Sequence, residues 1–167
     1  MRLLLLALAL NLLPNGLMAA ACQGEAANVA SRRFIFTQGE AYDTRTGLIW
    51  RRCSVGMTWT RGGGCTGERA SMSFTEALKA AGNAGPGWRI PSIKELYSLV
   101  DTACGAPHVD VRTFPDLRFK DEDESAYWTS SALGLAGLIY YVDLRTGDAD
   151  AHSPGFALAV RLVRSAR

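Results

Sequence analysis

The chain has 167 residues, with 18 basic and 16 acidic side chains and a hydrophobic fraction of 48%. A balance this close to neutral argues against nucleic-acid binding, which needs a strongly basic surface, and the apolar content excludes a disordered, highly charged chain. Length and composition predict one globular domain with a buried core.

The N-terminal residues have the three parts of a secretory signal peptide. Arg2 gives a positive start, residues 3–13 are an almost unbroken apolar run, and small residues follow at positions 19–21. This order is typical of a signal that is removed on export, and the run is too short to span a membrane, which takes about 20 apolar residues. We therefore expect residues 1–21 to be cleaved, with a buried N-terminal helix as the alternative, and the mature protein to be periplasmic or extracellular.

The expected cleavage site leaves Cys22 as the first residue of the mature chain. A lipoprotein signal usually has Leu three residues before such a cysteine, and here that residue is Ala19. We therefore expect an unmodified Cys22, with lipid anchoring through Cys22 as the alternative. No second long apolar stretch follows in the sequence, so we expect no transmembrane segment in the mature chain.

The mature chain contains four cysteines, and an even number in an exported protein favours two disulfides. Three pairings can connect Cys22, Cys53, Cys65 and Cys104. We favour Cys53–Cys65, which would close a glycine-rich loop, together with Cys22–Cys104, which would tie an N-terminal arm of residues 22–32 to the body of the domain. A zinc site is the alternative, but no C-x-x-C pair is present and the histidines lie away from ligand spacing.

In chain order, the first predicted elements are three short strands. Residues 33–36, 41–43 and 47–50 are strand-like, with turns at Gly39 and at residues 44–47. Residues 54–71 are rich in glycine and threonine, and we expect them to form a loop.

Two short helices are predicted next, each opened by a capping box, in which a Ser and the Glu three residues later bond each other's backbone. The first box is Ser73 with Glu76, and the second is Ser92 with Glu95. Apolar residues recur at helical spacing behind both boxes, which predicts helices over residues 73–81 and 92–100. Helices this short are not stable alone in water, so we expect them to pack on a sheet.

The last third of the chain predicts further strands over residues 127–129, 139–144 and 156–164. The order of strands, helices and strands predicts an α+β fold for a single domain over residues 33–165. The sequence D-x-R-T-G occurs at 43–47 and again at 143–147, and we interpret both as hairpin turns in which Asp binds the backbone and Gly has a positive φ. Paired calcium loops, the alternative, would need more carboxylates.

Several motifs, taken in order, resemble one known family. They are Asp43-x-x-Thr46-Gly47-Leu48-Ile49-Trp50-x-x-Cys53, Gly87-Trp88-Arg89-Ile90-Pro91-x-x-x-Glu95-Leu96, Thr113-Phe114-Pro115, Tyr127-Trp128-Thr129-Ser130-Ser131, Tyr141-Val142-Asp143 and Arg161-Leu162-Val163-Arg164. The set resembles the DUF1566 family, also called the Legionella collagen-like protein C-terminal (Lcl C-terminal) domain family, over residues 33–164. Its structural motif residues here are Asp43, Gly47, Trp50, Trp88, Arg89, Pro91, Glu95 and Trp128.

The resemblance implies a C-type-lectin-like or formylglycine-generating-enzyme-like fold, in which two short helices pack on a twisted antiparallel sheet and the termini lie near each other. It also implies an exported bacterial protein, because the members of the family are mostly exported. The collagen-like member is an adhesin whose C-terminal domain binds sulfated glycosaminoglycans. The present sequence has no Gly-x-y repeats before the domain, so the collagen stalk and its enforced trimer are not implied.

The candidate ligand-binding residues are basic side chains that could hold an anionic glycan through charge-assisted hydrogen bonds. They are Arg112, Arg118 and Lys120 in one stretch and Arg45 and Arg52 in another. Trp88 and Arg89 would also suit a sugar or a sulfate, but we expect a structural role for both, because tryptophan is usually largely buried. We expect Trp50 and Trp128 in the core for the same reason.

We expect no catalytic residues, no cofactor and no metal. His108 and His152 are isolated in expected loops, without the positioned partners that acid–base catalysis needs. The cysteine pair of the formylglycine-generating enzymes is also missing, because no cysteine follows Cys104. The acidic run 121–124 could bind calcium, but consecutive carboxylates cannot all face one ion, so we expect a solvated loop.

The sequence therefore predicts an exported, non-enzymatic binding module, and adhesion to or recognition of a glycan at the bacterial cell surface is the leading hypothesis. The alternative is a structural or assembly component that binds another envelope protein, and an enzyme ranks last. The oligomeric state is left open.

Overall fold

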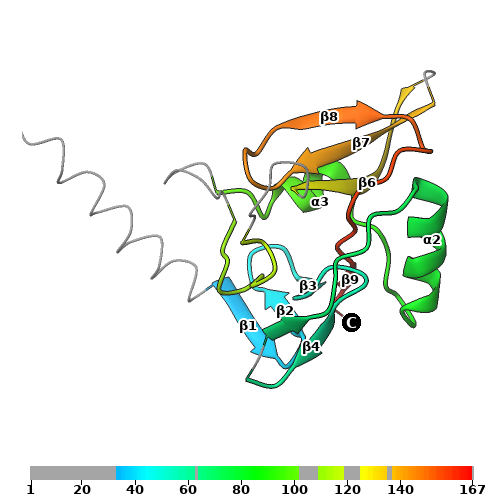
Figure 1. Ribbon diagram of the computed structural model, residues 1–167. Coiled ribbons are helices and arrows are strands. Elements are labelled where there is room, and N and C mark those ends of the chain that lie inside the picture. The colour runs from blue at the N-terminus through cyan, green and yellow to red at the C-terminus, as the bar shows by residue number, and fades with distance from the viewer. Residues whose placement is uncertain (1–32, 63, 102–108, 119–124, 135–136, 167) are drawn as a thin grey trace, which may run out of the picture.

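The computed structural model describes residues 33–62, 64–101, 109–118, 125–134 and 137–166 (Figure 1). The expected signal peptide and N-terminal arm lie outside these ranges, as do Cys22, Cys104, His108, Lys120 and the acidic run 121–124. The Cys22–Cys104 disulfide therefore stays a prediction. Among the helices of the described ranges, none is long and apolar enough to cross a membrane.

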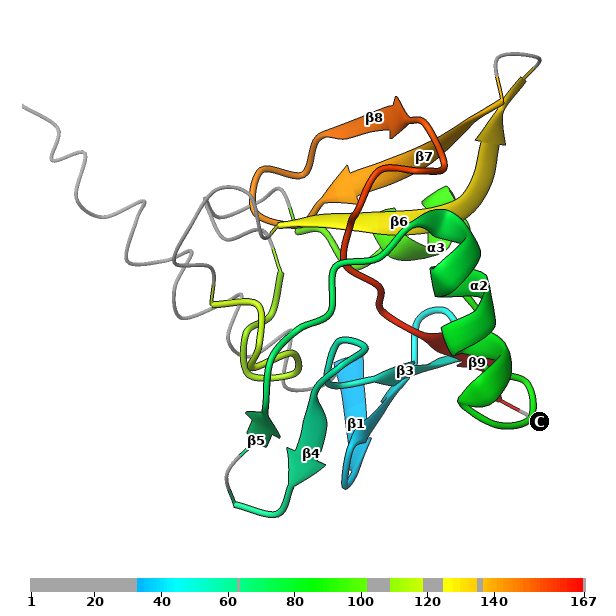
Figure 2. The same cartoon turned by 45° about the vertical axis from the view of Figure 1, so that its right-hand side comes forward.

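The described part of the domain contains two main antiparallel sheets and two short helices, which confirms the predicted α+β class. One sheet has the strand order β1-β2-β3-β9, and the other has the order β6-β7-β8. The bounds of these strands are β1 Phe34–Thr37, β2 Glu40–Asp43, β3 Leu48–Arg51, β9 Val163–Ser165, β6 Ala126–Leu133, β7 Leu138–Asp143 and β8 Ala149–His152. Figure 2 shows the two sheets as separate layers, with the end of the chain running between them.

Both predicted hairpin turns are present, at the β2–β3 and β7–β8 connections. A carboxylate oxygen of Asp43 accepts a hydrogen bond from the backbone N–H of Arg45 at 3.0 Å, and Asp143 accepts one from Arg145 at 2.8 Å. The glycines that close the turns have φ values of +70° and +82°, in the left-handed region that glycine adopts at little cost. The repeated D-x-R-T-G sequence is thus a turn motif in both places.

The two helices are α2, Phe74–Asn83, and α3, Ile93–Tyr97, and both predicted capping boxes are formed. Helix α3 ends three residues before the predicted end, because the chain tightens into successive turns at Ser98 and Leu99. The Ser98 hydroxyl donates to the Glu95 carbonyl at 2.7 Å and so satisfies a carbonyl at the helix end. Leu99 is still buried, as its place on the predicted apolar face requires.

Strand β6 connects two hydrophobic clusters, since successive strand residues point to opposite faces. Tyr127 packs in a cluster with Trp50 and Phe114, while Trp128 packs in a second cluster with Val160. Trp50 and Trp128 are fully buried, so both are core residues as expected. Trp128 also donates its indole N–H to the Met72 carbonyl at 2.9 Å.

The predicted final strand over 156–164 is confirmed only at its end, because regular pairing begins at β9 and residues 156–162 lie outside any named strand. The segment is extended, but it makes isolated bridges to different neighbours, such as Met72 with Leu158 and Tyr127 with Ala159. It crosses between the two sheets (Figure 2), and it is buried continuously from Leu158 to Val163. Alternating apolar residues predict a strand with one buried and one exposed face. Here both faces of residues 158–163 are buried, so the alternation has a different origin.

The predicted loop over 54–71 is also partly wrong, because it contains a small hairpin. Its strands are β4, Thr58–Thr60, and β5, Gly64–Thr66, which form a two-stranded sheet of their own. Strand β8 was not predicted either. His152 lies at its end, and the centroid of its ring is 3.6 Å from that of Phe156, on which it stacks. Glycine and alanine have low strand propensity, so strands this short and rich in these residues are not recognised from propensity.

Candidate functional site

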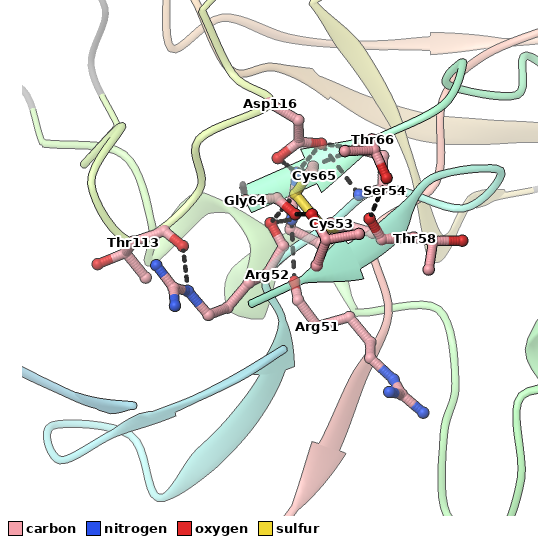
Figure 3. Close-up of a disulfide and its surroundings, with 12 residues drawn as sticks. Arg51, Arg52, Cys53, Ser54, Thr58, Gly64, Cys65, Thr66, Thr113 and Asp116 are labelled. Carbon is pink, nitrogen blue, oxygen red and sulfur yellow. Dashed lines mark hydrogen bonds and ion pairs between the residues drawn. A yellow bond between two sulfur atoms is a disulfide. The ribbon is translucent and has the colours of Figure 1, made fainter. Parts of the chain in front are cut away.

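A disulfide attaches the β4–β5 hairpin to the end of β3. Cys53 follows β3 and Cys65 lies on β5, with their Cα atoms 5.5 Å apart (Figure 3). This agrees with the pairing favoured from the sequence, and it leaves neither sulfur as a thiolate for the alternative zinc site. No free cysteine is present in the described part of the chain.

An open cleft of about 470 Å³ lies beside this disulfide, and we call it the Trp59 cleft. It brings together two of the predicted ligand-binding residues, Arg52 and Arg118, which are 66 positions apart in the sequence. The complete set of described lining residues is Arg52, Trp59, Gly62, Gly64, Cys65, Pro115 and Arg118. Because this set contains no Asp or Glu, the described wall of the cleft is positively charged and partly apolar.

The two arginines of the Trp59 cleft differ in their bonding. Arg52 points away from Arg51 and toward Thr113 (Figure 3). Its guanidinium donates to the carbonyls of Thr113 at 2.9 Å, Arg112 at 2.9 Å and Gln38 at 3.3 Å. Its faces contact the rings of Phe36 and Trp59, and burial lowers its pKa from the usual value. Arg52 is therefore committed to holding the wall of the cleft together.

Arg118, in contrast, is exposed and makes no hydrogen bond or ion pair with any residue that the structure describes. Its guanidinium keeps its donors available to a ligand in the cleft. Arg112 lies nearby but lines no described cleft, and its guanidinium is 3.6 Å from a carboxylate oxygen of Asp110. Arg118 is thus the uncommitted cation of the described Trp59 cleft.

A buried ion pair fixes the segment that carries Arg118. The fully buried Arg161 donates to both carboxylate oxygens of Asp116, at 2.9 and 2.8 Å. The same guanidinium donates to the carbonyls of Arg51 and Arg52 at 2.9 Å. Residues 109–118 are therefore tied to the end of β3, where the disulfide begins.

Asp116 is ionised in this network although it is buried. Burial alone would raise its pKa, but the charge of Arg161 and the hydrogen bonds from Ser54 outweigh that effect and hold the pKa below its usual value. Neither Arg161 nor Asp116 was predicted as part of a site, although Arg161 lies in one of the motifs of the family resemblance. The signal for Arg161 was a single charge inside the apolar run A-L-A-V-R-L-V, since a buried charge of this kind needs a partner.

The motif residues of the family resemblance form other internal contacts. Asp43 is fully buried and pairs with Arg33 at 2.6 Å. Trp88 is 9% exposed, and the guanidinium groups of Arg51 and Arg164 lie 4.3 and 5.1 Å from its ring. These contacts place Trp88 inside the domain rather than on a ligand platform.

Arg89 and Glu95, on either side of the buried Pro91 in the sequence, form a bidentate ion pair, in which two guanidinium nitrogens lie 2.7 Å from the two carboxylate oxygens. Glu95 also accepts a hydrogen bond from the Ser92 N–H at 2.8 Å, so one carboxylate caps α3 and anchors the preceding loop. The hydrogen bonds from Arg89 outweigh the effect of burial and, with the Ser92 bonds, lower the pKa of Glu95 to about 2.

The remaining predicted residue, Arg45, lines a different cleft of about 380 Å³, which we call the Tyr97 cleft. Its described lining is Arg33, Arg45, Thr46, Tyr97, Ser98, Val100 and Asp101. The structure thus separates the predicted binding residues into two places instead of one. Trp59 and Tyr97 were both missed; Trp59 was hidden in the expected loop, and Tyr97 lies off the apolar face of the second predicted helix.

The model of the Lcl C-terminal domain family matches residues 39–164, which include the described Trp59 cleft, the described Tyr97 cleft except Arg33, and the strands from β2 to β9 except the last residue of β9. The chain therefore belongs to the Lcl C-terminal domain family, here in the form of an α+β domain with an internal disulfide. A search of curated proteins finds none that matches.

Proposed function

We propose that this protein is an exported, non-enzymatic binding module that recognises an acidic glycan through the Trp59 cleft, in adhesion or recognition at the bacterial cell surface. The observation that carries the proposal is that Arg118, with its guanidinium uncommitted, lines the same cleft as the indole of Trp59. Guanidinium groups bind carboxylates and sulfates through paired, charge-assisted hydrogen bonds. An indole offers an apolar surface against which the C–H face of a sugar ring packs.

The preorganisation of the wall supports this function. Trp59 is held at 3.9 Å from the Arg52 guanidinium, and its hairpin is attached by the disulfide. A ligand therefore pays little to order the aromatic surface, which favours affinity. The volume of the cleft also falls in the range of small-molecule sites.

Export and fold type belong to the same proposal. A structural disulfide is typical of proteins that fold in an oxidising compartment, which supports export to the periplasm or beyond. The first and last strands of the domain, β1 and β9, belong to one antiparallel sheet. This arrangement supports a C-type-lectin-like fold, in which the ends of the domain lie near each other.

The test is binding of oxidised protein, residues 22–167, to an array of neutral, carboxylated and sulfated glycans. We expect binding to acidic glycans that weakens at high salt and is unchanged by EDTA. Arg118→Ala and Trp59→Ala should each weaken it, while Lys79→Ala, which removes an exposed charge from α2, should leave it unchanged. The proposal is wrong if no acidic glycan binds, or if neither cleft substitution weakens the binding.

A second function, assembly with another envelope protein, is favoured by one observation. Edge strand β1 presents Ile35 and Phe36 with 58% and 47% of their surfaces exposed. Exposed apolar residues beside an edge strand are a common basis for protein association. If this function holds, a partner captured from an envelope extract by the wild-type protein should be lost with Ile35→Lys and retained with Arg118→Ala.

A further inference from the structure

The Tyr97 cleft repeats the chemistry of the Trp59 cleft at another place in the fold. It lies between the β2–β3 turn, which carries Arg45 and Thr46, and the end of α3, which carries Tyr97 and Ser98. The Trp59 cleft adjoins the opposite end of β2, where Arg52 bonds the Gln38 carbonyl of the β1–β2 turn. Figure 2 shows the β4–β5 hairpin beside that β1–β2 turn.

Each cleft contains one committed arginine. In the Tyr97 cleft it is Arg33, whose guanidinium donates to Asp43 at 3.0 and 2.6 Å and to the Ser98 carbonyl at 2.8 Å. Its guanidinium also lies 4.7 Å from the ring of Phe34. Arg33 thus corresponds to Arg52: both fix a wall through carbonyl bonds and ring contacts.

Each cleft also contains one uncommitted arginine and an aromatic ring. The Arg45 side chain makes no hydrogen bond or ion pair within the described ranges, and the residue is exposed. Tyr97 is 45% exposed, although it closes a helix whose other apolar residues face the core. The Tyr97 cleft therefore combines an accessible aromatic ring with an available guanidinium, as the Trp59 cleft does with Trp59 and Arg118.

We propose that the Tyr97 cleft is a second binding site, and that it takes a sugar bearing a carboxylate or a sulfate. The class of ligand rests on the function proposed for the Trp59 cleft, whereas the site itself rests on the geometry of Arg45 and Tyr97. Asp101 lines this cleft, and its negative charge opposes an anionic ligand. The Tyr97 cleft is therefore the weaker of the two sites.

Two sites on one domain give a defined stoichiometry, which separates this proposal from the first. The experiment is an equilibrium titration of oxidised protein, residues 22–167, with a disaccharide that contains one uronic acid and one sulfate. Wild-type protein should bind two molecules, with unequal affinities. Arg45→Ala should lower the affinity of the weaker site at least about tenfold, as expected for the loss of a charge-assisted bond. Tyr97→Ala should also weaken this site, because it removes the aromatic surface against which a sugar ring would pack.

Matched variants distinguish the outcomes. Arg118→Ala should remove only the stronger site, and Lys79→Ala should retain both. One site that is insensitive to Arg45→Ala would overturn the second site and leave the first standing. One site that is lost with Arg45→Ala and kept with Arg118→Ala would support the Tyr97 cleft and overturn the Trp59 cleft. No binding at all would overturn both.

Discussion

The indole of Trp59 lies 3.9 Å from the guanidinium carbon of Arg52, and this contact connects three parts of the chain. Arg52 also bonds the β1–β2 turn through Gln38 and the 109–118 segment through Thr113. One side chain therefore sets the position of the aromatic wall relative to the loop that carries Arg118.

Arg52→Lys should loosen that connection. A lysine ammonium keeps the charge but cannot reach three separate carbonyls while lying flat against two rings. We expect the free energy of unfolding to fall by about 1–3 kcal/mol, measured by urea denaturation, and acidic-glycan binding to weaken. Arg118→Lys is the control, because an exposed side chain with no described partner should change stability by less than about 0.5 kcal/mol. Equal stability of the two variants would contradict the role of Arg52.

Asp116→Asn should be among the most damaging single substitutions. It leaves the charge of the fully buried Arg161 without its counter-charge, and breaking a buried pair in this way costs about 3–5 kcal/mol. Urea denaturation measures the loss, and Glu68→Gln, at an exposed position, should change stability little. A loss below about 1 kcal/mol would show that the pair does not support the loop.

The stability of the domain should fall as the pH drops from about 4.5 toward 2. The pKa of Glu95 is lowered from 4.5 to about 2 in the folded protein, chiefly by its hydrogen bonds with Arg89, and those of Asp43 and Asp116 are also lowered. A depressed folded pKa stabilises the protein above the unfolded pKa, and this contribution is lost as protons bind. Denaturation at several pH values should show the fall, with a shallower slope in Glu95→Gln. An unchanged slope in that variant would contradict the contribution of Glu95.

Removing the disulfide should affect the two clefts unequally. Cys53→Ser combined with Cys65→Ser frees the β4–β5 hairpin and should cost about 2–4 kcal/mol. In the disaccharide titration the stronger site should weaken, because Trp59 is on that hairpin, while the site at Arg45 should persist under conditions where the variant is folded. Loss of both sites together in a folded variant would argue against independent clefts.

Peptide mapping without reductant tests the remaining cysteines. We expect mature protein to yield peptides linked through Cys53–Cys65 and through Cys22–Cys104, with no free thiol. A lipid-modified Cys22 or a free Cys104 would contradict the second link. Finding Cys53 joined to any other cysteine would contradict the first.

Features that depend on neighbouring residues could be predicted from the sequence. The capping boxes at Ser73 and Ser92 and the turns at Asp43 and Asp143 involve groups within four residues of each other, so their patterns are visible in the chain. The Cys53–Cys65 pairing was favoured for a similar reason, since it closes a short loop.

The clefts could not be predicted in the same way. Arg52 and Arg118 are the same residue type, so the sequence does not distinguish them. The guanidinium of Arg52 is bonded by partners some 60 residues away, such as Thr113, whereas that of Arg118 remains available. The segment 156–162 has the alternation of a strand, yet its backbone bonds several elements in turn. These outcomes depend on tertiary contacts, which local propensity does not encode.

The crossing segment that ends at β9 also determines when the domain can fold. Leu158 to Val163 fill the space between the two sheets, and β9 completes the edge of the sheet that begins with β1. Neither layer has its full core until these last residues are present, so the domain cannot reach its native state before its C-terminal end has been synthesised. For the exported protein that we propose, folding would be completed only after the whole domain has crossed the membrane, in a compartment where Cys53 and Cys65 can be oxidised.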